Sequence, residues 1–206
     1  MAKTIYIATS NPGKLRDFAA AGEIHGFAVT EMPCLDRIPP PPENEATFEG
    51  NARAKAIYYS RLAPGFDIIA DDSGLEVDAL KGEPGVHSAR YAASAGFPST
   101  GDTDQDNNLL LVKNLTTTPE AARRARYRCV LALANSGEVV LTAEGEVEGR
   151  IGFEPRGNGG FGYDPLFYLP ELDKTMAEIE LETKNSLSHR GRALRNLFTK
   201  LHELLA

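Results

Sequence analysis

Short apolar segments alternate with helical patterns in the first third of the chain, and this order restricts the fold more than any other feature. The expected strands are residues 3–9, 28–29 and 67–71, and the expected helices are residues 12–23 and 47–62. Later, residues 104–115 are typical of a helix with apolar residues at Leu109, Leu110, Leu111 and Leu115. Residues 126–134 and 139–147 are typical of two strands, and Asn135-Ser136-Gly137 between them is a hairpin signal. This order predicts an α/β fold with a mixed sheet flanked by helices.

Length and composition agree with one globular domain over residues 1–206, of which 42% are apolar and 25% charged. No apolar run approaches the roughly 20 residues that span a bilayer, and the apolar start of the chain is too short for a signal peptide. We therefore expect a cytoplasmic protein. The net charge of −7 disfavours a nucleic-acid polymer as partner, but a local cationic pocket can still hold a single nucleotide. Cys34 and Cys129 are too few for a disulfide framework or a thiolate zinc site.

The apolar run that begins at Ile68 leads directly into two carboxylates, Asp71 and Asp72, followed by Ser73 and Gly74. Charge at the carboxyl end of a strand lies at the edge where α/β proteins build their sites, and carboxylates there can hold Mg²⁺. Because neighbouring strand residues point to opposite faces, we expect one aspartate to act on a metal ion. The other would accept hydrogen bonds from the turn. The alternative is an aspartate that only caps the turn with Ser73.

Residues 9–14 join the first expected strand to the first expected helix. Such a junction exposes backbone N–H groups and the positive end of the helix dipole, which suits phosphate. Lys14 adds a positive charge, and Thr9 and Ser10 add hydroxyl donors. The segment lacks the Walker pattern of a P-loop, and an ordinary capped turn is the alternative interpretation.

The glycine-rich residues 157–162 match the pattern GxGxxG, but the sequence after them does not form a helix, so a dinucleotide-binding fingerprint is excluded. Phe161 and Tyr163 in this loop could stack on a base, and Asp164 could accept hydrogen bonds. A loop with ordinary aromatic packing is the alternative.

Cations gather where the last helix is expected to begin. His189 and Arg190 lie near its N-terminus, with Lys184 upstream, and cations there oppose the helix dipole. An anion would resolve this conflict, and a solvated basic turn is the alternative. Another set of cations alternates along one expected strand, which is typical of a solvated face: Arg124, Arg126 and Arg128.

Together these segments resemble the inosine/xanthosine triphosphate pyrophosphatase family, whose members remove non-standard purine nucleotides. The matching motifs keep the family's order from residue 4 to the final helix, and the ordered set is much more specific than any single motif. The motifs are Thr9-Ser10-Asn11-Pro12-Gly13-Lys14, Thr47-Phe48 with Asn51-Ala52 and Lys55-Ala56, Ala70-Asp71-Asp72-Ser73-Gly74-Leu75, Gly82 with Pro84-Gly85, Ser88-Ala89-Arg90-Tyr91, Gly159-Gly160-Phe161-Gly162-Tyr163-Asp164-Pro165 and Ser188-His189-Arg190-Gly191.

The resemblance implies an elongated mixed sheet in two lobes, with the active site in the cleft between them. It also implies hydrolysis of ITP, dITP and XTP to the monophosphate and pyrophosphate, with Mg²⁺, in a homodimer. Carried over by position, Asp72 is the general base and a metal ligand, and Glu43 is a second metal ligand. The residues implied in substrate binding are Thr9, Ser10, Asn11, Pro12, Gly13, Lys14, Lys55, Ser73, Phe161, Gly162, Tyr163, Asp164, Lys184, His189 and Arg190.

One motif departs from the family pattern. Family members commonly have Thr-Phe-x-Glu-Asn-Ala, whereas this chain has Gly50 in place of the glutamate. The metal-binding carboxylate aligns near Glu43, and Glu45 is the alternative. Each of the two could also be a solvated loop acid.

The hypothesis for the reaction is in-line attack of water on the α-phosphorus. Asp72 would orient or deprotonate the water, and Mg²⁺ with Lys14 and Lys55 would offset charge on the leaving pyrophosphate. Hydrogen bonds to the 6-oxo group of the base would exclude adenine. One alternative is a phosphatase that cuts the γ-phosphate and releases orthophosphate. Another is a nucleotide sensor that is stabilised by its ligand without turnover.

Overall fold

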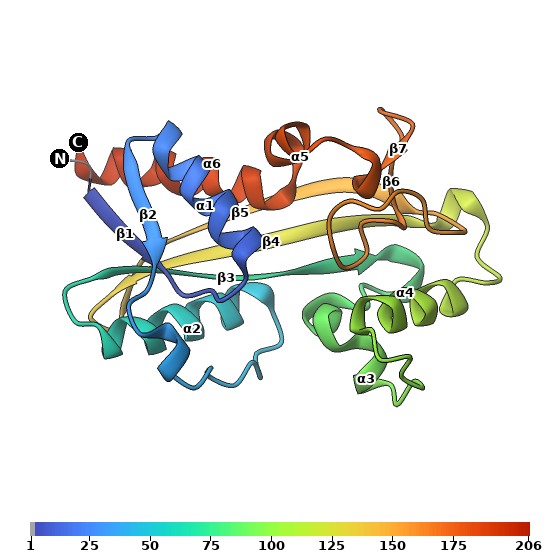
Figure 1. Ribbon diagram of the computed structural model, residues 1–206, viewed down its shortest axis with the longest axis horizontal. Helices are drawn as coiled ribbons and strands as arrows, with labels where there is room; N and C mark the ends of the chain where they lie inside the picture. The colour runs from blue at the N-terminus through green and yellow to red at the C-terminus, as the bar shows by residue number, and fades with distance from the viewer. Residues whose placement is uncertain (1–2) are drawn as a thin grey trace. The chain divides into compact units, whose positions relative to one another are not determined.

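The computed structural model describes residues 3–206 and, at positions 181, 182 and 185, only the backbone. Its strands form one sheet in the order β2-β1-β3-β4-β5-β6-β7 (Figure 1). β1 pairs in parallel with β2 and β3, whereas β6 pairs antiparallel with β5 and β7, so the predicted mixed sheet is confirmed. The strands are β1 (Lys3–Ile7), β2 (Phe27–Glu31), β3 (Asp67–Val77), β4 (Arg124–Asn135), β5 (Glu138–Ile151), β6 (Phe167–Leu169) and β7 (Lys174–Thr175).

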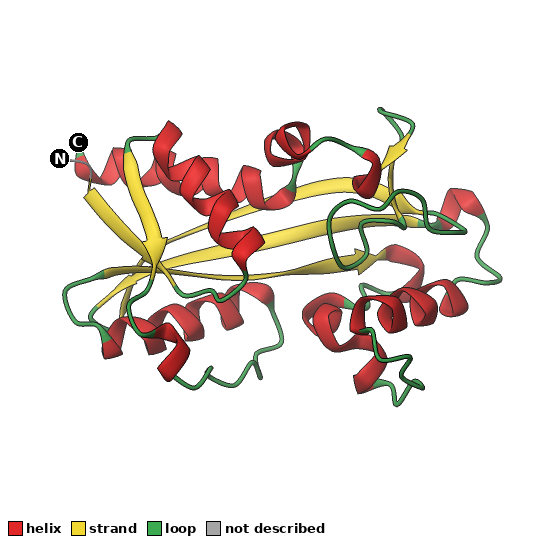
Figure 2. Cartoon of the chain, in the orientation of Figure 1, coloured by secondary structure: helices red, strands yellow, loops and turns green. Residues whose placement is uncertain are grey.

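Figure 2 shows the helices that accompany this sheet. The expected helices over residues 12–23, 47–62 and 104–115 are present, whereas the short α5 was not expected. The α-helices are α1 (Pro12–Ile24), α2 (Phe48–Leu62), α3 (Tyr91–Ser94), α4 (Thr103–Asn114), α5 (Leu181–Leu187) and α6 (His189–Leu205). The 3₁₀ turns are η1 (Leu35–Arg37), η2 (Asp78–Leu80), η3 (Gly85–Arg90), η4 (Glu120–Ala122) and η5 (Met176–Glu178).

Capping side chains explain where α1, α2 and α4 begin. Asn11 Oδ1 accepts the N–H groups of Gly13 and Lys14 at the start of α1. Thr47 Oγ1 accepts the N–H of Gly50 at the start of α2, at 3.0 Å, and Asp102 caps α4. Each cap satisfies donors that the helix itself leaves unpaired.

The chain divides into two compact units. The first unit comprises Met1–Asp72, Cys129–Gly145 and His189–Ala206, and the second comprises Ser73–Arg128 and Glu146–Ser188. That the whole chain acts as a single domain stays a prediction.

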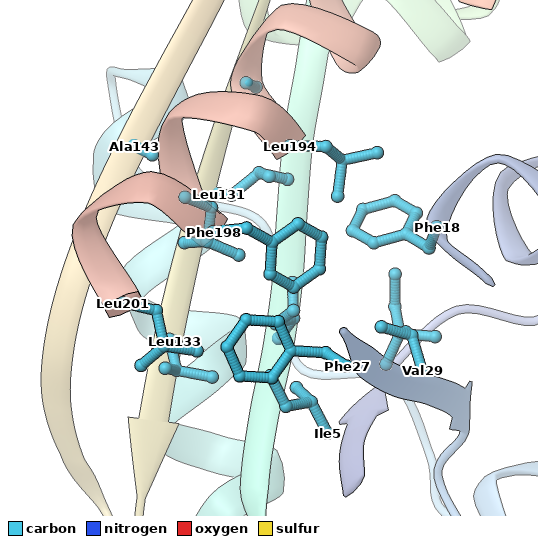
Figure 3. Close-up of a cluster of buried hydrophobic side chains, with 14 of the residues drawn as sticks. Ile5, Phe18, Phe27, Val29, Leu131, Leu133, Ala143, Leu194, Phe198 and Leu201 are labelled. Carbon is cyan, nitrogen blue, oxygen red and sulfur yellow. The ribbon is translucent and has the colours of Figure 1, made fainter. Parts of the chain in front are cut away.

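Strand alternation sorts the core of the first unit into two faces. Ile69 packs in a cluster with Phe18 of α1 and Phe198 of α6. Figure 3 labels the two phenylalanines among the side chains of this cluster. Ile68, the neighbour of Ile69, packs in a different cluster, with Tyr59 of α2. α1 and α6 therefore cover one face of the sheet in this unit and α2 covers the other, and the neighbouring residues Ile68 and Ile69 point to different helix layers.

The core of the second unit forms around the last part of β3. Leu75 and Val77 pack with Leu111 of α4, with Leu115 at its C-terminal cap and with the ring of Tyr127. These leucines lie four residues apart and so share one face of the helix. The apolar stripe expected in residues 104–115 is therefore buried in this cluster.

One expectation about strands is wrong. β3 does not end at Asp71 but runs through Asp72, Ser73 and Gly74 to Val77, so the expected acidic turn does not exist. The three arginines of β4 do alternate with buried residues on its more exposed face, as expected, and this face also carries ion pairs: Arg126 Nη2 lies 3.0 Å from Asp78 Oδ1 and its Nε lies 2.9 Å from Glu148 Oε1. Arg128 pairs with Glu76 in the same way. Opposite charges on neighbouring strands stabilise such pairs.

Candidate active site

Asp72 is buried on the α2 face of β3, where two side chains of α2 hold its carboxylate. Asn51 Nδ2 donates to Oδ2 at 3.0 Å, and Lys55 Nζ donates to Oδ1 at 3.1 Å. Asn51 and Lys55 are four residues apart, which places them on the same face of α2. The Oδ1 atom of Asn51 accepts the N–H of Glu45 at 3.0 Å, so the same amide also ties down the loop before the helix.

Glu43 joins this group through Lys55. Its Oε1 atom lies 2.8 Å from Lys55 Nζ, so one ammonium group bridges the carboxylates of Glu43 and Asp72. Of the two candidate glutamates, Glu43 is therefore the one that shares a cation with Asp72, and the side chain of Glu45 is exposed. Among the residues that the structure describes, no group of three or more His, Cys, Asp or Glu side chains could hold a metal ion.

Asp71 points to the opposite face of β3, toward α1 and α6. Its Oδ2 atom accepts a hydrogen bond from Lys14 Nζ at 2.8 Å. The expectation that the two aspartates face different ways is confirmed. One of the two aspartates was expected to accept hydrogen bonds from a turn. Asp71 instead lies within a strand that continues past it, and its partner is a lysine of α1.

The pKa values of the two aspartates are shifted in opposite directions. Burial raises the pKa of Asp72 above its ordinary value, although Lys55 and the amide of Asn51 work against this. Burial would also raise the pKa of Asp71, but the nearby charges of Lys14, Arg190 and Lys55 hold that pKa well below its ordinary value. Burial lowers the pKa of Lys55, but the surrounding carboxylates raise it more, so that pKa lies above its usual value. Asp72 is thus the better proton acceptor of the pair.

Residues 9–14 form the junction between β1 and α1, as expected. Pro12 occupies the start of the helix, and Asn11 caps it. Thr9 is buried and its Oγ1 atom accepts the N–H of Asn11 at 3.3 Å, whereas Ser10 is exposed. Lys14 is the residue of this segment that reaches Asp71, and phosphate binding by the segment stays a prediction.

Arg190 is the second residue of α6 and is buried, with only 5% of its surface exposed. Its Nη1 atom lies 3.3 Å from Asp17 Oδ2 of α1. The side chain thus belongs to the charged layer that includes Lys14 and Asp71, rather than to a solvated basic turn. Its neighbour His189 is half-buried.

In the second unit, Asp164 organises the glycine-rich loop. Its Oδ2 atom accepts the N–H of Phe161 at 3.0 Å and also pairs with Lys184 Nζ, and its Oδ1 atom accepts the hydroxyl of Tyr127. The ammonium of Lys184 lies 5.5 Å from the ring centroid of Phe161, a cation–π distance. Asp164, Lys184 and Phe161, which the sequence analysis selected separately, therefore form one group.

Gly162 is held by α4, from residues that the sequence analysis missed. Its N–H donates to Asp104 Oδ2 at 2.6 Å, and its C=O accepts from Asn108 Nδ2 at 2.9 Å. Asp104 and Asn108 share a face of α4 by their i, i+4 spacing, but residues 103–108 are all polar, so the sequence does not single these two out.

Tyr163 corrects one expectation. Its ring is 4% exposed and lies in the core, and its hydroxyl donates to Ser88 O at 2.8 Å. Burial raises the pKa of Tyr163 far above its ordinary value. The ring is therefore not available to stack on a base. Phe161 is 48% exposed, so its ring is accessible for stacking on a base. Ser73, for which substrate contact was implied, is half-buried on β3.

Comparison with known proteins assigns the chain to a family. A family model described as the Ham1 family matches residues 5–200. The chain belongs to the Ham1 family. The resemblance stated from the motifs is thereby confirmed, and it covers nearly the whole chain.

Relatives within the Ham1 family carry the name dITP/XTP pyrophosphatase. One from Acidobacterium capsulatum is 53% identical over 203 residues, which is 98% of this chain and 99% of that relative. One from Geobacillus kaustophilus is 45% identical over 203 residues, covering 98% and 96% of the two chains. The Ham1 protein of Coxiella burnetii has a solved structure with a TM-score of 0.84 and 35% identity, covering 98% of this chain and 99% of that one.

The structure gives a reason for Gly50 where the Ham1 resemblance led us to expect glutamate. A Cβ atom at position 50 would lie 2.8 Å from Glu45 Cβ and 3.2 Å from Thr47 Oγ1. The first of these distances is shorter than side-chain carbons tolerate, so the acidic loop packs onto α2 more closely than a larger residue allows. The loop that carries Glu43 is thus fitted to a glycine at this position.

No helix within residues 3–206 has both the length and the apolar character to cross a lipid bilayer.

Proposed function

We propose that this chain hydrolyses dITP, ITP and XTP to the nucleoside monophosphate and pyrophosphate. The observation that carries the proposal is the near-complete match to relatives named dITP/XTP pyrophosphatase, at up to 53% identity. The local geometry supports it, because a carboxylate with a raised pKa lies beside a lysine and a second carboxylate. This is the set that attack of water on a phosphoryl group requires.

A divalent cation fits the residues present. Glu43 Oε1 and Asp72 Oδ1 already face one cation, the Lys55 ammonium, which acts as a stand-in for an ion at this position. Mg²⁺ prefers oxygen ligands and is commonly held by one or two carboxylates together with substrate phosphates. We propose Glu43 and Asp72 as the ligands of Mg²⁺. When bound, the ion would neutralise charge on the phosphates.

In the proposed reaction, Asp72 orients a water molecule and accepts its proton at a carboxylate oxygen. Asn51 holds the other oxygen, so that the carboxylate does not rotate away. The ammonium groups of Lys55 and Lys14 offset negative charge on the leaving pyrophosphate. In the second unit, Phe161 offers an exposed ring for the base, with Lys184 fixed beside it by Asp164.

Product analysis tests the proposal. The wild-type protein is incubated with Mg²⁺ and, separately, with dITP, ITP, XTP, ATP and GTP, and pyrophosphate and orthophosphate are measured. We expect pyrophosphate from the first three and little product from the last two. Orthophosphate alone would indicate cleavage at the γ-phosphate. Ligand-dependent thermal stabilisation without any product would indicate a nucleotide sensor.

We also propose that the protein acts in the cytoplasm, as a homodimer. Light scattering on the eluate of a size-exclusion column measures the mass in solution. A mass of twice 22.3 kDa supports the dimer, and 22.3 kDa at all concentrations contradicts it.

A further inference from the structure

The proposed reaction uses Asp72 and gives its neighbour Asp71 no task. Asp71 is nevertheless a buried carboxylate, 5% exposed, in the middle of a strand. A buried carboxylate is costly unless it is paired, and carboxylates are rare inside strands. Its presence therefore calls for an explanation from the residues that it contacts.

Asp71 is separated from the proton-transfer group by the strand itself. The side chain shares its face of β3 with Ile69, in the layer covered by α1 and α6, whereas Asp72 lies on the α2 face with Asn51 and Lys55. The hydrogen bond of Asp71 goes to Lys14 instead.

Lys14 is held at both ends. Its backbone N–H donates to Asn11 Oδ1 at 3.1 Å, and its Nζ donates to Asp71 Oδ2 at 2.8 Å. Its side chain is still 23% exposed, so the ammonium can reach a ligand while one of its protons stays on Asp71. An ammonium group has three donors, and a lysine fixed in this way loses less freedom when an anion binds.

We propose that Asp71 is a positioning residue that holds the Lys14 ammonium for contact with the phosphates and takes no part in proton transfer. The inference rests on the proposed pyrophosphatase function of the same site. It separates two adjacent aspartates into different tasks: Asp71 acts through a lysine, and Asp72 acts on water.

A double-mutant cycle, in which kcat/KM for dITP is compared among four proteins, tests this role. Asp71→Asn and Lys14→Met should each lower kcat/KM for dITP by about 10- to 100-fold, the scale expected when a catalytic group is misplaced. In the Lys14→Met background, Asp71→Asn should cost less than about twofold, because the residue through which it acts is gone. The acid limb of the pH profile of kcat/KM should stay where it is in the wild type. Full additivity, or a shifted acid limb, would overturn the proposal.

A binding measurement separates this inference from the proposed function. Inorganic tripolyphosphate is titrated into the same four proteins by calorimetry, which requires neither a base nor turnover. Each single variant should bind tripolyphosphate more weakly than the wild type does. The double variant should bind it no more weakly than Lys14→Met does. If wild-type protein released no pyrophosphate from dITP, the proposed function would fail, and this titration would still decide the role of Asp71.

The double variant also protects the test against misfolding. It removes both members of the ion pair and leaves no unpaired buried charge, which is the change that most destabilises such sites. Lys14→Met alone leaves the buried Asp71 carboxylate without its lysine, so if that variant does not fold, the comparison between Asp71→Asn and the double variant remains. A further tenfold loss of tripolyphosphate affinity in the double variant would contradict the proposal.

Discussion

Asn51 and Asp72 are joined by a buried hydrogen bond of 3.0 Å, from the amide Nδ2 to the carboxylate Oδ2. With Lys55 on the other oxygen, this bond fixes the plane of the carboxylate, while burial raises its pKa. A general base needs both a fixed direction and affinity for a proton. The contact between α2 and β3 therefore supplies what the proposed reaction requires.

Asp72→Asn should lower kcat for dITP by about 10³-fold or more, because the amide cannot accept the proton of water. The variant should still fold, since asparagine keeps the size of the side chain and an oxygen for Asn51. Turnover is measured by pyrophosphate release and folding by circular dichroism. A well-folded variant that keeps a tenth of wild-type activity would remove Asp72 from the role of base.

Lys55→Met should tighten the binding of Mn²⁺ in the absence of nucleotide by about tenfold or more, a free-energy change of about 1.4 kcal/mol. The ammonium of Lys55 bridges the two proposed ligand carboxylates, and its replacement removes the cation that they share. Electron paramagnetic resonance of free Mn²⁺ gives the affinity. Lys14→Met is the matched control, because its partner Asp71 lies on the other face of β3. Equal affinity in wild type and Lys55→Met would contradict the proposed ligands.

Gly160→Ala should raise the KM for dITP by roughly tenfold or more, about 1.4 kcal/mol in binding. A Cβ atom at this position would lie 2.0 Å from Asp164 Oδ2 and 2.7 Å from Lys184 Nζ, so it would separate that pair. Gly101→Ala is the control, since Gly101 also has a positive φ but has no atom within 4 Å of the added Cβ. An equal effect of both substitutions would mean that backbone strain alone is responsible.

Phe198→Ala should lower the free energy of unfolding by about 3–5 kcal/mol, because the ring is fully buried against Phe27 in the first-unit core. Leu204→Ala on the same helix should change it by less than about 0.5 kcal/mol, since Leu204 is 60% exposed. Urea denaturation measures both. A small loss for Phe198→Ala would show that α6 contributes little to this core.

The stability difference between wild type and Asp71→Asn should depend on pH. The pKa of Asp71 in the folded protein lies below its ordinary value of 3.8, so the ionised form stabilises the folded state above pH 3.8. This contribution is lost as the pH falls from 3.8 toward the lower folded-state pKa, because the unfolded chain takes up the proton first. Urea denaturation at pH 7, 5, 4 and 3 should show the difference narrowing in acid. A constant difference would mean that Asp71 is not charged in the folded protein.

The ends and faces of several elements could be predicted because local signals and burial agree. Asn11 with Pro12 and Thr47 mark helix starts by their capping chemistry, and α6 carries its apolar residues at helical spacing. The opposite directions of Asp71 and Asp72 follow from strand geometry alone.

The continuation of β3 could not be predicted from local preference. Asp71, Asp72, Ser73 and Gly74 are poor strand formers, and they stay in the strand because distant lysines neutralise the carboxylates and Leu75 and Val77 are buried beyond them. The same limit applies to Tyr163, since a loop tyrosine is equally typical of an exposed ring and of a core residue. Only its contacts in the second-unit core distinguish the two.

Hydrolysis of dITP in ¹⁸O-labelled water tests the central claim most directly, with the position of the label read by mass spectrometry of the products. If Asp72 directs water at the α-phosphorus, the label appears in the phosphate of dIMP and the pyrophosphate stays unlabelled. Label in pyrophosphate or in orthophosphate would place the attack on another phosphorus and contradict the account.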